Sequence, residues 1–172
     1  MIAAAPMIRA YHGDDQVALQ EAFAKDLGQW CGGDSLAKEV IHLEECEPAR
    51  AGAVVLEACQ TQSLFAEQRA VVVYEAERFP ADAEDALAKW IADPTPGTAL
   101  FLVFGKWDGR SKLAKLLSAV QGAVRAFEAP KSWEMAKAVA AVAEQNGFRV
   151  SPDVAERISD LLGADIDRVR IE

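Results

Sequence analysis

Short apolar runs rich in β-branched residues alternate along the chain with segments whose apolar residues recur at helical spacing. Five such runs are predicted as strands, over residues 7–11, 38–43, 70–74, 98–105 and 123–127. The segments between them have the period of amphipathic helices, and Pro48 suits the first position of the second helix. Strands that alternate with helices favour a parallel sheet with helices on both faces. The pattern therefore predicts an α/β fold with a five-stranded parallel sheet.

The pattern changes near Ala129 and Pro130. Two further helical stripes follow, one beginning near Met135 and one after Pro152, and no further strand pattern appears. We therefore expect two domains, an α/β domain over residues 1–129 and a small helical domain over residues 130–172.

Composition and charge narrow the functional classes. The 172 residues are 51% hydrophobic and 26% charged, with a formal net charge of −9. This negative charge disfavours an independent DNA-binding module, because the phosphates of DNA are also negatively charged. Three cysteines without CxxC spacing indicate free thiols in a reducing compartment, so we expect a cytoplasmic protein. The longest apolar run is far too short to span a membrane.

The α/β pattern is also typical of nucleotide-dependent ATPases and kinases, so this function has to be considered. A phosphate loop needs G-x-x-x-x-G-K-[ST], whose amides, lysine and hydroxyl hold the phosphates and Mg²⁺. The turn after the first strand reads "HGDDQVAL", which has one glycine, no lysine and no hydroxyl. Gly105 and Lys106 form only a weak lookalike, better interpreted as a turn with solvated basic residues. We therefore expect no nucleotide cofactor.

No other pattern predicts catalysis or a metal site. His12 ends the first strand and His42 lies in the second, and single histidines outside a motif are usually structural. Glu75 and Glu77 follow the third strand and resemble the acidic strand end that organises Mg²⁺ in ATPases, but a solvated strand exit is the simpler interpretation. We therefore predict no catalytic residue and no metal ligand.

Three stretches resemble a known family. They are "CQTQSLFAEQRAVVVYEAERF", "PTPGTALFLVFGKWDGRSKLAK" and "AEQNGFRVSPDVAERISDLLGADIDR". Together they resemble the delta subunit of bacterial DNA polymerase III, which belongs to the sliding-clamp loader. The most specific element is Q-x-x-S-L-F, which is formed here by Gln60, Ser63, Leu64 and Phe65. The resemblance extends over the whole chain.

The resemblance implies an architecture and partners. In that family a degenerate AAA+ domain, RecA-like and without a phosphate loop, precedes a small helical lid and a helical collar. This chain corresponds to an N-terminal portion, with the lid incomplete and the collar absent. The implied partners are the sliding clamp (the beta subunit) and the gamma/tau and delta prime subunits. DNA is met only as part of the loader, and the subunit is not an enzyme by itself, although it belongs to the polymerase holoenzyme.

The apolar pair Leu64 and Phe65 then has two interpretations. It could fold back against the core as a staple at the helix end. The resemblance implies instead a wedge that enters an apolar pocket on the clamp, with Gln60 at the pocket rim and Ser63 fixing the turn. Both interpretations stay open at the level of sequence.

Overall fold

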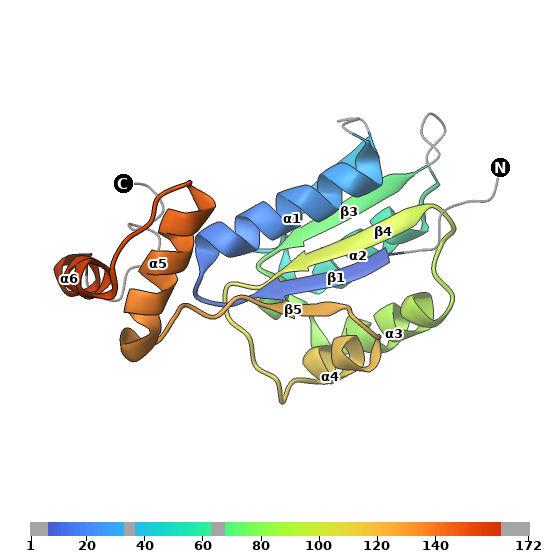
Figure 1. Ribbon diagram of the computed structural model, residues 1–172. Helices are drawn as coiled ribbons and strands as arrows, with labels where there is room; N and C mark the ends of the chain where they lie inside the picture. The colour runs from blue at the N-terminus through green and yellow to red at the C-terminus, as the bar shows by residue number, and fades with distance from the viewer. Residues whose placement is uncertain (1–6, 33–36, 63–67, 163–172) are drawn as a thin grey trace. The chain divides into compact units, whose positions relative to one another are not determined.

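A computed structural model describes residues 7–32, 37–62 and 68–162 of the chain. Its centre is a parallel five-stranded sheet in the order β2-β3-β4-β1-β5 (Figure 1). The strands are β1 Met7–His12, β2 Lys38–His42, β3 Arg69–Tyr74, β4 Thr98–Val103 and β5 Val124–Ala126. All five lie where the sequence predicts strands, so the predicted fold class is confirmed.

Helices connect the strands and continue after the last one. The α-helices are α1 Gln16–Cys31, α2 Pro48–Gln60, α3 Glu84–Ala92, α4 Lys112–Ala119, α5 Met135–Gln145 and α6 Pro152–Leu162. Short 3₁₀ turns occur at η2 Ala76–Arg78, η3 Ala81–Ala83 and η4 Ser132–Glu134. Helix α2 begins at Pro48 as predicted, where the missing N–H of proline costs no helical hydrogen bond.

Strand β4 is the centre of the core. Its six residues are all buried, and it pairs with β3 on one side and with β1 on the other. Alternate residues point to opposite faces, so a strand buried at every position needs cover on both. Its sequence, TALFLV, satisfies this requirement because every residue after Thr98 is apolar.

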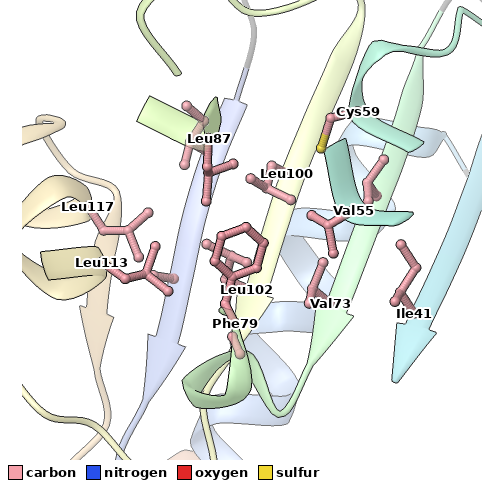
Figure 2. Packing of buried hydrophobic residues seen from close by; sticks show 14 of the residues in the cluster. Ile41, Val55, Cys59, Val73, Phe79, Leu87, Leu100, Leu102, Leu113 and Leu117 are labelled. Atoms are coloured by element: carbon pink, nitrogen blue, oxygen red, sulfur yellow. The ribbon is translucent and has the colours of Figure 1, made fainter. Parts of the chain in front are cut away.

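Helix α1 covers one face of the sheet and helices α2, α3 and α4 cover the other (Figure 1). On the α1 face, Phe23 makes edge contacts with the rings of Tyr11 and Phe101, 5.6 and 6.0 Å between centroids. On the opposite face, Figure 2 shows side chains of β3 and β4 packed against those of the covering helices. Ten residues labelled there illustrate this cluster: Ile41, Val55, Cys59, Val73, Phe79, Leu87, Leu100, Leu102, Leu113 and Leu117.

A polar network joins α1 to the sheet. The carboxylate of Asp26 accepts a hydrogen bond of 2.7 Å from the Tyr11 hydroxyl and also pairs with the guanidinium of Arg125. Burial, together with the hydrogen bond to Asp26, raises the pKa of Tyr11, so the phenol stays protonated. The network satisfies polar groups at a helix–sheet contact that is otherwise apolar.

The chain divides into two compact units. One contains residues 1–13 and 19–126, and the other contains residues 14–18 and 127–172. In the second unit α5 packs against α6, and Ala155 of α6 is buried. Large apolar side chains of this unit are nevertheless exposed, among them Trp133, Phe148 and Leu161. The predicted limit at residue 129 and the assignment of an incomplete lid stay predictions.

Two helical glycines offer a matched test of the packing. A Cβ at Gly52 of α2 would lie 2.3 Å from the Cβ of Ala83, whereas a Cβ at Gly28 of α1 would meet no atom within 4 Å. We expect Gly52→Ala to lower the free energy of unfolding by about 1–3 kcal/mol through overpacking. Gly28→Ala should raise it by about 0.5–1 kcal/mol, because alanine favours the helix. Urea unfolding of both variants measures the difference, and changes of the same sign would contradict this account.

The three cysteines should differ in reactivity. All are free thiols; Cys59 is buried, whereas Cys31 and Cys46 are half-buried. Burial raises the pKa of Cys59 to about 12, and the thiolate is the reactive form. At pH 8 a disulfide reagent such as Ellman's should therefore modify Cys31 and Cys46 in the folded protein and Cys59 only after denaturation. Equal rates for all three cysteines would contradict the packing of α2 described above.

Candidate functional site

The parallel sheet has two chemically different ends. All strands run in the same direction, so the turns after them gather at the carboxyl end and the turns before them at the amino end. Ligands of open α/β sheets usually bind at the carboxyl end. The Q-x-x-S-L-F motif, in contrast, precedes β3 and therefore belongs to the amino end. The two ends are therefore described separately.

At the start of α1 an acid takes the position of a phosphate ligand. The Oδ1 atom of Asp15 accepts a hydrogen bond of 2.9 Å from the Ala18 amide, and only 5% of Asp15 is exposed. In phosphate-binding turns the amides at a helix start bind the phosphate, since the helix dipole favours an anion there. Here a carboxylate of the chain itself supplies the negative charge.

Aromatic rings occupy the carboxyl ends of β1 and β4. The His12 ring at the end of β1 stacks on Trp107, 4.3 Å between centroids and 5° between planes. Trp107 also makes an edge contact with Phe104, 4.9 Å between centroids. Both rings follow β4 at the place where the sequence has its Gly-Lys lookalike, Gly105 and Lys106. The loop after β4 thus packs onto the end of β1.

The structure does not bring His12 and His42 together. His12 ends β1 and His42 ends β2, and β3 and β4 lie between these strands. His42 stacks on Tyr74, 4.8 Å between centroids. Each histidine therefore has an aromatic partner of its own.

The interpretation of Glu75 and Glu77 as a solvated strand exit agrees with the exposure of Glu77 but not with that of Glu75. Glu75 is half-buried, has a left-handed backbone with φ 53°, and places Oε2 3.5 Å from Nδ1 of His42. Burial, and next the charge of Glu75, raise the pKa of Tyr74. Glu77 is exposed, but its Oε2 accepts a hydrogen bond of 3.0 Å from the Gly105 amide. Both acids make specific local contacts, which periodicity cannot reveal.

Within residues 7–32, 37–62 and 68–162, no group of three or more His, Cys, Asp or Glu side chains could hold a metal ion. Nor does any helix of the described residues have the length and apolarity needed to cross a membrane.

At the amino end, the motif begins on α2. Gln60 is the last residue of α2 and is exposed, and Thr61 ends the helix with an extended backbone. The Thr61 amide and hydroxyl both donate to the Glu57 carbonyl, at 3.0 and 2.7 Å. The other three residues of the predicted motif, Ser63, Leu64 and Phe65, lie outside the described residues. The structure thus places Gln60 but does not test the predicted wedge.

Arg69 joins the two ends of the segment that contains the motif. Its Nη1 donates a hydrogen bond of 2.7 Å to the carbonyl of Thr61, and its guanidinium pairs with Glu39 on β2. Its backbone is fixed as well, because its amide donates to Gly97 and its carbonyl accepts from the Trp30 indole, at 2.8 and 3.0 Å. We call the bond between Arg69 and Thr61 the loop anchor. Sequence reasoning missed it, since these partners are distant in sequence.

The fold and the turn after β1 define the class of this protein. It contains an α/β domain with a parallel five-stranded sheet, and the turn after β1 lacks the residues of a phosphate loop. The model of the family "DNA polymerase III, delta subunit" matches residues 10–127, more than half of the chain. The chain therefore belongs to the DNA polymerase III delta subunit family.

Comparison with solved structures agrees in fold. The Bacillus subtilis DNA clamp loader delta protein (YqeN) matches with a TM-score of 0.66 and 18% sequence identity. The match covers 95% of this chain and 50% of that protein, so the chain spans about half the length of this relative. No curated protein matches the chain at a significant level.

The carboxyl end should not bind MgATP. The turn after β1 has neither the lysine nor the hydroxyl that the phosphates and Mg²⁺ need, and Asp15 already occupies an amide of the first turn of α1. Calorimetric titration with MgATP should give no saturable heat, and a working ATPase of the same architecture serves as the positive control. Micromolar affinity for MgATP would contradict this account and favour the ATPase alternative.

Proposed function

We propose that this chain is part of a clamp-loader delta subunit that binds the ring-shaped sliding clamp of the bacterial replicase and helps to open it. The observation that carries the proposal is the family match over residues 10–127. In this proposal the chain is cytoplasmic, has no catalytic activity of its own and needs no cofactor. Its protein partners are the clamp (the beta subunit) and the gamma/tau and delta prime subunits, and it meets DNA only within the loader.

The proposed contact is the Q-x-x-S-L-F motif, with Leu64 and Phe65 as the wedge. Burying one leucine and one phenylalanine in a pocket contributes on the order of 1.5–3 kcal/mol each. Association also costs several kcal/mol, roughly 4–15, in lost translational and rotational freedom. The wedge therefore needs a wider contact, to which exposed Gln60 at the end of α2 can add a hydrogen bond.

The loop anchor supports this proposal. The bond from Arg69 to Thr61 joins the residues on either side of positions 62–68, so both ends of the segment are fixed to the sheet domain. Fixing the ends lowers the conformational entropy that binding must remove. A contact segment fixed in this way can transmit force to α2 and β3.

Clamp opening follows from differential binding. A protein shifts a conformational equilibrium only by as much as it binds one state better than the other. In our proposal the wedge holds the clamp beside its dimer interface, and α2 fits the open ring better than the closed one. Binding energy is thereby converted into opening without a chemical step in this subunit. We also propose that residues 130–172 belong to the lid of the subunit.

The double variant Leu64→Ala/Phe65→Ala tests the wedge. If both side chains contact the clamp, the melting temperature should stay within a few degrees of wild type while clamp affinity falls by about 100-fold or more. Thermal melting and binding to an immobilised bacterial sliding clamp are the two measurements. The matched control is Phe148→Ala/Leu161→Ala, which removes the same two residue types where they are 68% and 83% exposed. This control should keep full clamp binding.

Two results would count against the wedge. Truncation of core leucine and phenylalanine costs about 2–5 kcal/mol each, so a large fall in melting temperature would place the pair in the core as a staple. If the variant is folded and its clamp affinity is unchanged, Leu64 and Phe65 do not contribute to clamp binding. If wild-type protein does not bind the clamp at all, the proposed function itself fails.

A further inference from the structure

A cavity of about 230 Å³ lies at the carboxyl end of the sheet, on the face covered by α3 and α4. Residues after β3 and after β4 form one part of its lining, and residues at the starts of α3 and α4 form the other. Neither the family match nor the proposed clamp contact gives this cavity a role, because the motif belongs to the amino end of the sheet. Its volume is suited to a single long side chain.

The most buried polar group of this cavity is Glu84. Only 7% of Glu84 is exposed, and its Oε1 accepts a hydrogen bond of 3.1 Å from the Leu113 amide at the start of α4. Among the described residues, no ion pair within 4 Å includes Glu84. A buried carboxylate is costly, and the Leu113 amide together with the charge of Lys112, which is paired with Asp85, offsets only part of that cost. A carboxylate can also accept further hydrogen bonds.

The charges along the rest of the cavity leave an excess of negative charge. Asp108 lies 3.3 Å from the guanidinium of Arg110, which offsets it. Lys106 brings one positive charge to the lining, and Glu77 and Glu84 bring two negative charges. The net negative charge of the lining favours binding of a cationic group over binding of an anion or a nucleotide. Lys112 at the start of α4 pairs with Asp85 at 2.6 Å, and its charge also acts on Glu84.

Aromatic side chains form the apolar part of the lining. Phe79 and Phe104 are buried, and the Trp107 ring stacks on His12 and makes an edge contact with Phe104. All three aromatic residues line the cavity. A guanidinium is planar, stacks on aromatic faces and donates to carboxylates in its own plane, whereas an ammonium is a compact and strongly hydrated charge. Aromatic rings beside a buried carboxylate therefore select arginine over lysine.

We propose that this cavity is a binding site for the arginine side chain of a partner protein, with the guanidinium paired to Glu84 beside the aromatic residues. The site does not depend on the clamp contact, since the two lie at opposite ends of the sheet. We expect the partner protein to present an exposed arginine to the cavity between the starts of α3 and α4.

N-acetyl-arginine amide is the probe for this site. Titration into the whole chain should shift the amide resonances of Gly105 and Leu113 and the indole resonance of Trp107 saturably, with a dissociation constant on the order of 1 mM for so small a ligand. N-acetyl-citrulline amide has nearly the same shape without the charge and should bind at least about 10-fold more weakly.

Two variants should move the affinity in opposite directions. Glu84→Gln keeps an acceptor for the Leu113 amide and removes the charge, so affinity for the arginine probe should fall about 10-fold. Lys106→Gln removes a repulsive charge from an exposed position and should raise affinity about 2-fold. Glu57→Gln on α2 is the control for net charge and should leave affinity unchanged. Thermal melting of each variant confirms that it is folded.

Several outcomes would overturn the proposal. Equal binding of the citrulline probe would show an apolar cavity without selection for charge. Saturable binding of inorganic phosphate at the same resonances would show an anion site. If Glu84→Gln fails to fold, the direction of the Lys106→Gln effect and the citrulline comparison still decide. If the wild-type chain binds the arginine probe but not the clamp, the proposed function fails while the arginine site stands.

Discussion

The pairing of β4 with β3 and β1 is the constraint on which the rest of the sheet domain depends. A strand with neighbours on both sides and apolar residues on both faces cannot lie at a surface, so helices must cover each face. The parallel direction follows because helical crossovers join successive strands. The burial of β4 thus requires the helical layers, and the helical crossovers give the strands one direction and the sheet two distinct ends.

The carboxyl and amino ends of the sheet differ in the contacts that their residues make. At the carboxyl end, Asp15 caps α1 and Trp107 packs on His12. The cavity beside Glu84 lies at the same end. At the amino end, Arg69 orders the backbone around the segment that carries the motif. The contact proposed for the clamp is therefore assigned to the end of the sheet opposite the turn that follows β1.

The sequence predicted the fold well because periodicity and helix-start signals are local. All five strands, the start of α2 at Pro48 and the free cysteines agree with the structure. The strand order, with β4 between β3 and β1, depends on contacts between distant residues and has no local signal. The same holds for Arg69, whose partners Thr61 and Glu39 lie 8 and 30 residues away, and for the left-handed backbone of Glu75. Of the predicted motif the structure describes Gln60 alone, so the wedge rests on the family and on the loop anchor.

The loop anchor has a consequence for how such a subunit changes over time. It uses the backbone carbonyl of Thr61 and the side chain of Arg69, so any residue at position 61 can serve as the acceptor. Substitutions at position 61 can therefore accumulate without loss of the hydrogen bond that links the end of α2 to the start of β3, whereas position 69 needs a side chain that can donate.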